Sequence, residues 1–143
     1  MSKFDTSDPP RLRAPVIAWQ LAQTFWVGGL WLLHFMLLPA LDKIGLAPLL
    51  VQEVASGLRP LLVGFSAVCV LLQGMGLVMA LGLRALWRDM RGQLLLAVLL
   101  LAAGYFVARA GWLGDEYWQM FSYLAMACCG LLLVVQSPPE ARR

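Results

Sequence analysis

The sequence contains four apolar runs, each long enough to cross a lipid bilayer as a helix. They cover residues 16–40, 61–83, 94–113 and 117–135. A helix needs about 20 mainly apolar residues to cross a hydrocarbon core of roughly 30 Å. Hydrophobic residues make up 61% of the 143-residue chain and charged residues 13%, whereas soluble domains are nearer half apolar and a quarter charged. We therefore expect an all-α integral membrane protein with four transmembrane helices in one antiparallel bundle.

Prolines indicate where the runs begin and end. Pro39 stands at the end of the first run and Pro60 immediately before the second, and proline favours such helix boundaries. The first run is too long for a signal peptide, and no small-residue cleavage site follows it. The expected organisation is a cytoplasmic N-terminal segment at 1–14, a transmembrane domain at 15–136 and a cytoplasmic tail at 137–143.

The basic residues predict the orientation of the bundle. One group lies before the first span, between the second and third spans and after the fourth: Lys3, Arg11, Arg13, Arg84, Arg88, Arg91, Arg142 and Arg143. A smaller group lies on the opposite side: Lys43, Arg59 and Arg109. Because cytoplasmic loops carry the excess of Lys and Arg, both termini are expected in the cytoplasm.

The first outer loop, residues 42–59, has a helical pattern of its own. Its apolar residues recur at roughly helical spacing: Ile44, Leu46, Leu49, Leu50, Val54 and Leu58. This pattern predicts an amphipathic helix on the outer surface, or an extension of the second span. A plain connector that contains apolar residues is the remaining alternative.

Small residues line one face of each of the first three spans. The stripes are Ala18, Ala22 and Gly29; Gly64, Ala67 and Gly74; and Ala97, Gly104 and Ala108. Helices in lipid associate by close packing at small residues, so each stripe predicts a helix–helix contact. Packing within the bundle is the simpler interpretation, and contact with another subunit is the alternative.

Polar side chains fall at one depth in the outer half of the spans, when depth is counted at about 1.5 Å per residue. The layer and its outer edge comprise His34, Ser66, Arg109, Asp115, Glu116, Gln119 and Tyr123. Polar residues in spans are costly and tend to face the bundle interior. One hypothesis is an outward-facing pocket, with His34 as its titratable group and Arg109 as its fixed charge, that binds an anionic headgroup or relays a proton.

The alternative hypothesis for this layer is structural. Arg109 would reach the interface and pair with Asp115 or Glu116, and His34 would only hydrogen-bond a neighbouring helix. In the inner half, Gln23 and Gln73 could continue a polar path, but interhelical hydrogen bonds explain them more simply.

The sequence lacks the motifs of the common enzyme classes. No Gly-rich phosphate loop, HExxH or GxSxG occurs. A haem would need a second axial ligand beside His34, of which Met120 is the best placed. No cofactor, metal or enzymatic activity is expected. The net charge of +3 is spread over the flanks of the spans, so no nucleic-acid partner is expected either.

Two segments carry a resemblance to a known family. The segments are LAQTFWVGGLWLLHFMLLPAL at 21–41 and LRPLLVGFSAVCVLLQG at 58–74. The first resembles the DUF4149 family of small membrane proteins in its tryptophan, Gly-Gly pair, second tryptophan and proline. The overall pattern is similar to the version found in Gram-negative bacteria. The resemblance implies a bacterial inner-membrane location and the fold, and it assigns no catalytic residues.

Three interpretations of function follow. The first is a non-enzymatic inner-membrane protein that packs against lipids or other membrane proteins, as a homo-oligomer or in a hetero-complex. The second is a small transporter or permeation subunit that uses the polar layer around His34 and Arg109. The third, a haem-linked protein or membrane enzyme, rests on His34 alone.

Overall fold

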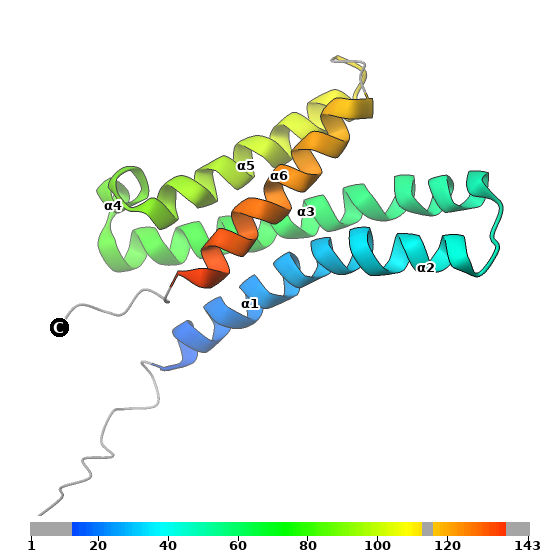
Figure 1. The fold of residues 1–143 in the computed structure, drawn as a ribbon. Helices are drawn as coiled ribbons and strands as arrows, with labels where there is room; N and C mark the ends of the chain where they lie inside the picture. Colours follow the sequence, from blue (N-terminus) through cyan, green and yellow to red (C-terminus); the bar gives the residue numbers. More distant parts are fainter. Residues whose placement is uncertain (1–12, 113–115, 137–143) are drawn as a thin grey trace, which may run out of the picture.

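The computed structural model describes residues 13–112 and 116–136, and these residues are helical apart from short connections (Figure 1). The elements in chain order are α1 (Arg13–Leu32), the π-helical turn η1 (Leu33–Leu37), α2 (Leu38–Lys43), α3 (Pro48–Leu81), α4 (Leu83–Arg88), α5 (Met90–Arg109) and α6 (Glu116–Val135). Four helical stretches are long and apolar enough to cross a membrane: Ala14–Lys43, Pro48–Leu81, Met90–Arg109 and Glu116–Val135. This is the composition of a multi-pass integral membrane protein.

The long helices enclose a common core. Helix α1 packs against α3 and α6, and α5 packs against the same two helices. Each of the four therefore has two neighbours, and all four contribute fully buried side chains: Trp26, Leu30, Val63, Val70, Val98, Tyr105, Tyr123 and Met126. The described part of the chain is thus a helical bundle, as expected.

The helices differ greatly in length. Helix α3 has 34 residues, whereas α5 and α6 have 20 each. At about 1.5 Å per residue, α3 is roughly 20 Å longer than the other two. In Figure 1 the paired ends of α2 and α3 accordingly project past α5 and α6.

The second span does not begin at Pro60. Pro60 lies inside α3, which runs without a break from Pro48 to Leu81, so the prediction of a helix boundary there is wrong. Of the alternatives for residues 42–59, the extension of the second span is the one observed for residues 48–59. A proline inside a helix removes the hydrogen bond to the carbonyl four residues earlier, which is that of Ser56.

The first span does not end at Pro39 either. The π-helical turn Leu33–Leu37 precedes this proline, and the chain continues as helix α2 to Lys43. The proline ring would clash with the carbonyl of Phe35 in a regular α-helix. The wider turn, in which the Leu38 N–H donates to the Leu33 carbonyl, relieves this clash and lets the helix continue.

The connection between α3 and α5 contains a helix that the hydropathy pattern did not predict. Gly82 breaks the chain direction with φ 86°, a conformation that favours glycine, and α4 follows. Gly92 lets α4 approach α5, because a Cβ at Gly92 would lie 2.5 Å from the Leu86 carbonyl oxygen. The third span consequently starts at Met90 and ends at Arg109, four residues earlier at each end than predicted. The fourth span agrees with its prediction to within one residue.

Candidate functional site

His34 lies in the π-helical turn, facing α6. Its ring is 5.9 Å from that of Tyr123 and 5.0 Å from that of Phe35. The imidazole is half-buried, and its buried Nδ1 has no hydrogen-bond partner among the described residues. Of the predicted polar layer, the structure brings His34 and Tyr123 together.

Arg59 is a residue of this region that the sequence analysis placed only among the loop charges. Its positive charge acts electrostatically on His34, Tyr105 and Tyr123. Arg59 is half-buried and lies one turn before the buried Val63 of α3. Arg59 stands four residues before Val63. The helical spacing would therefore have placed Arg59 on the buried face of the second span if the predicted helix had begun before Pro60.

Arg109 has a structural partner. Its side chain is exposed, and its Nη1 donates a hydrogen bond of 3.0 Å to the carbonyl oxygen of Ser56. That carbonyl is the one that Pro60 leaves without a backbone donor. Neighbouring helices commonly satisfy backbone groups freed by proline in membrane helices. Arg109 thus links α5 to α3.

The other described members of the predicted layer differ in their burial and in their partners. Ser66 is fully buried and donates to the Leu62 carbonyl of its own helix at 2.7 Å. Glu116 is exposed at the first residue of α6, and Gln119 is half-buried one turn later. Asp115 lies outside the described residues. Of the predicted layer, the described residues show a direct approach of His34 and Tyr123, and the charge of Arg59 acts on both.

The contact between α1 and α6 contains two side chain–backbone hydrogen bonds and a glycine at close approach. The Tyr123 hydroxyl donates to the Leu30 carbonyl at 2.6 Å, and the Trp31 Nε1 donates to the Ala127 carbonyl at 3.2 Å. One turn further on, a Cβ at Gly130 would lie 2.7 Å from Val27 Cγ2. Glycine is therefore needed there for the helices to approach. Sequence reasoning missed Gly130, although it stands four and seven residues after positions 126 and 123 on one helix face.

The predicted small-residue contacts are only partly present. Gly29 is close to α3, since a Cβ there would lie 3.3 Å from Leu62 Cδ2, and a Cβ at Gly64 would lie 3.8 Å from Phe106 Cζ. Ala22 is half-buried. Gly74 and Gly104 would meet no atom within 4 Å, so these two are not points of close helix approach.

Gln73 binds across the bundle. Its Oε1 accepts a hydrogen bond of 3.4 Å from the Trp26 Nε1, and its Nε2 donates to the Trp19 carbonyl at 3.1 Å. Gln73 is almost completely buried. These bonds join α3 to α1 and support the interhelical interpretation of Gln73 over a polar path.

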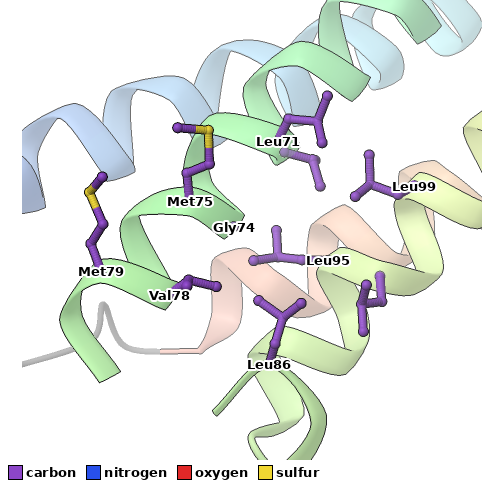
Figure 2. Close-up of a pocket in the computed structure, with 10 residues that line it drawn as sticks. Leu71, Gly74, Met75, Val78, Met79, Leu86, Leu95 and Leu99 are labelled. Carbon is purple, nitrogen blue, oxygen red and sulfur yellow. The ribbon is translucent and has the colours of Figure 1, made fainter. Parts of the chain in front are cut away.

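A cavity of about 300 Å³ lies away from the polar residues, between α3, α4 and α5 (Figure 2). We call it the apolar hollow. Its lining is entirely apolar: Val70, Leu71, Gly74, Met75, Val78, Met79, Leu86, Leu95, Leu96 and Leu99. The described residues contain no cluster of side chains suited to hold a metal ion.

Comparison with known proteins adds no relative to these observations. No family model matches the chain, and neither a curated protein nor a solved structure is significantly similar to it. The resemblance of residues 21–41 to the DUF4149 family therefore stays a prediction.

Proposed function

We propose that the protein is a non-enzymatic protein of the bacterial inner membrane that packs against lipids or other membrane proteins. In this proposal the four long helices form an antiparallel bundle with both termini in the cytoplasm, as the distribution of basic residues indicates. The chain would act through its lipid-facing surface.

One observation carries this proposal: several polar side chains of the spans hold the helices together. Gln73, Tyr123 and Trp31 each hydrogen-bond a neighbouring helix, and Arg109 binds the carbonyl freed by Pro60. Meanwhile large side chains such as Phe25, Met79 and Phe121 are exposed on the outside of the bundle. Such a surface suits lipid and other membrane helices.

Mild extraction followed by co-purification tests the proposal. The tagged chain is expected to retain phospholipid or a defined membrane protein, identified by native mass spectrometry. An unrelated four-span protein with the same tag, purified from the same strain, is the control for non-specific capture. A chain recovered free of both lipid and protein, or carrying only what the control carries, would contradict the proposal.

A small permeation subunit is the second candidate function, and the buried Nδ1 of His34, which has no hydrogen-bond partner among the described residues, is the observation that favours it; the charge of Arg59 acts on this group. In a strain lacking the protein, this function requires that His34→Ala and Arg59→Gln fail to restore the wild-type phenotype. Lys43→Gln removes an exposed charge elsewhere and should restore it. Full complementation by all three variants removes the permeation function.

A further inference from the structure

The apolar hollow opens to the outside of the bundle. Leu71, Met75 and Met79 lie at its rim with exposed fractions of 52%, 56% and 84%. Figure 2 shows their side chains and Val78 on α3, with Leu95 and Leu99 of α5 on the other side and Leu86 of α4 at one end. In a membrane-spanning bundle, an apolar opening on the outer surface faces the lipid.

The apolar hollow is deep at Gly74 because glycine has no side chain to fill it. A Cβ at this position would meet no atom within 4 Å, although Gly74 lines the hollow. The space beside Gly74 between α3 and α5 is therefore not filled by side chains. At about 300 Å³ it lies at the lower end of the range of about 300–1,000 Å³ for ligand cavities. It suits a section of one hydrocarbon chain.

Helix α4, which contributes Leu86 to this apolar space, also carries Arg84 and Arg88. Ala85 and Leu86 are half-buried, and Leu86 contributes to the hollow, whereas Arg84, Trp87 and Arg88 are exposed. These three exposed residues, with Leu83, line a second, shallow depression on the outer side of α4. One six-residue helix thus presents an apolar face to the hollow and two guanidinium groups to its surroundings.

The local charge is positive in sum. Arg91 follows on the first turn of α5, and Asp89 between the two helices is the neighbouring acid. Arginine binds phosphate with two parallel hydrogen bonds. Tryptophan is typical of the membrane interface, and Trp87 is 72% exposed. This end of the bundle therefore matches an amphipathic anion: a phosphate group outside and a hydrocarbon chain inside.

We propose that this region binds an anionic phospholipid. One acyl chain occupies the apolar hollow against Gly74, and the headgroup phosphate binds Arg84 and Arg88. Charge complementarity selects this occupant over a neutral lipid, since basic clusters at helix ends bind anionic headgroups. The inference rests on the proposed function, because it names the lipid that the bundle surface retains.

Binding of defined lipids to the delipidated full-length protein in detergent tests the inference. The probes are phosphatidylglycerol, cardiolipin and phosphatidylcholine with matched acyl chains, measured by native mass spectrometry. Both anionic lipids should bind in preference to phosphatidylcholine. Arg84→Gln with Arg88→Gln should weaken the binding of anionic lipid about 30-fold, the factor expected for two basic groups at the surface. Equal binding of all three lipids overturns the proposal.

The glycine variants test the position of the acyl chain. Gly74→Leu should weaken binding about tenfold, the factor for roughly two methylene groups left unburied. Gly76→Leu is the matched control, since Gly76 is exposed on the same helix, has open space around it and does not line the hollow. Equal losses in both variants, or none in Gly74→Leu, overturn the assignment. Circular dichroism confirms that each variant is folded.

Two further measurements separate the alternatives. Inorganic phosphate should fail to displace phosphatidylglycerol, because it lacks the chain that fills the hollow, and displacement at comparable concentration would show a simple anion site instead. If the wild-type protein binds no anionic lipid but still co-purifies with a membrane protein, the inference fails and the proposed function stands.

Discussion

Two helix interfaces of the bundle each include a glycine, and the two glycines differ in what surrounds them. Between α1 and α6, a Cβ at Gly130 would lie 2.7 Å from Val27 Cγ2 and 2.9 Å from ring atoms of Trp26. Between α3 and α5, a Cβ at Gly74 would meet nothing within 4 Å. The first glycine removes a side chain so that two helices can touch, and the second leaves a space open between them.

The hydrogen bonds distinguish the α1–α6 interface from the part of the α3–α5 interface that contains the apolar hollow, while Arg109 joins α5 to α3 at the other end of α3. The α1–α6 interface has two side chain–backbone bonds, from Tyr123 and from Trp31, whereas the lining of the apolar hollow is entirely apolar. In lipid, where apolar contact alone favours association little, close packing and hydrogen bonds provide the specificity. We infer that the α1–α6 interface stabilises the fold and that the α3–α5 interface is the part available to a ligand.

Alanine at the two glycines should give the largest difference in stability. Gly130→Ala forces its methyl group against Val27 and Trp26 and should lower the free energy of unfolding by about 1–3 kcal/mol, the usual cost of overpacking. Gly74→Ala adds a methyl group to empty space and should leave stability unchanged or raise it by up to about 1 kcal/mol, because alanine favours helix over glycine. Thermal and denaturant unfolding in the same detergent compares the two variants. Equal effects would contradict the division between the interfaces.

Tyr123→Phe should have a smaller effect on the same interface. The substitution keeps the buried ring and removes the hydroxyl that donates to the Leu30 carbonyl at 2.6 Å, so the expected loss is about 1 kcal/mol. Tyr117→Phe is the control, since Tyr117 is on the same helix and 88% exposed. Unfolding curves that coincide for the two variants would show that the bond to Leu30 contributes nothing to stability.

The sequence predicts those structural features that depend on one segment of the chain. It does not predict the features that depend on contacts between two helices. Hydropathy alone places four membrane-length helices, because lipid requires each span to satisfy its own backbone. The helix boundaries predicted at Pro39 and Pro60 are wrong, although helices often stop at proline. A π-helical turn accommodates Pro39 within the helix, and Arg109 satisfies the carbonyl that Pro60 leaves without a donor. Those compensations involve other elements, so no local pattern reveals them.

The candidate site shows the same limit. Depth along a helix follows from counting residues, and the rings of His34 and Tyr123, predicted at one depth, lie 5.9 Å apart. Rotation about the helix axis and the identity of the neighbour decide contacts, and these come from packing. Ser66 satisfies its own helix, and Gly130 matters only because Trp26 stands opposite. A residue's partner was therefore the information that the sequence lacked.

The smallest predicted effect concerns the hydrogen bond from Arg109 to the Ser56 carbonyl, which Pro60 leaves without a backbone donor. It tests whether α5 also stabilises α3 at the end of α3 that is remote from the apolar hollow. Arg109→Met removes the donor to the Ser56 carbonyl and should cost about 0.6 kcal/mol, a typical value for a hydrogen bond between membrane helices. In Pro60→Ala the backbone N–H of residue 60 returns and can satisfy that carbonyl itself.

The double variant with Arg109→Met and Pro60→Ala therefore gives the decisive measurement. If Arg109 acts by satisfying the carbonyl freed by Pro60, Arg109→Met should cost nearly nothing in the Pro60→Ala background, and the cycle should show a coupling as large as the single effect. Lys43→Met, which removes an exposed charge at the end of α2, should behave identically in both backgrounds. An Arg109→Met cost that does not depend on residue 60 would mean that the arginine stabilises α5 by other contacts. The proline in α3 would then be tolerated without help from its neighbour.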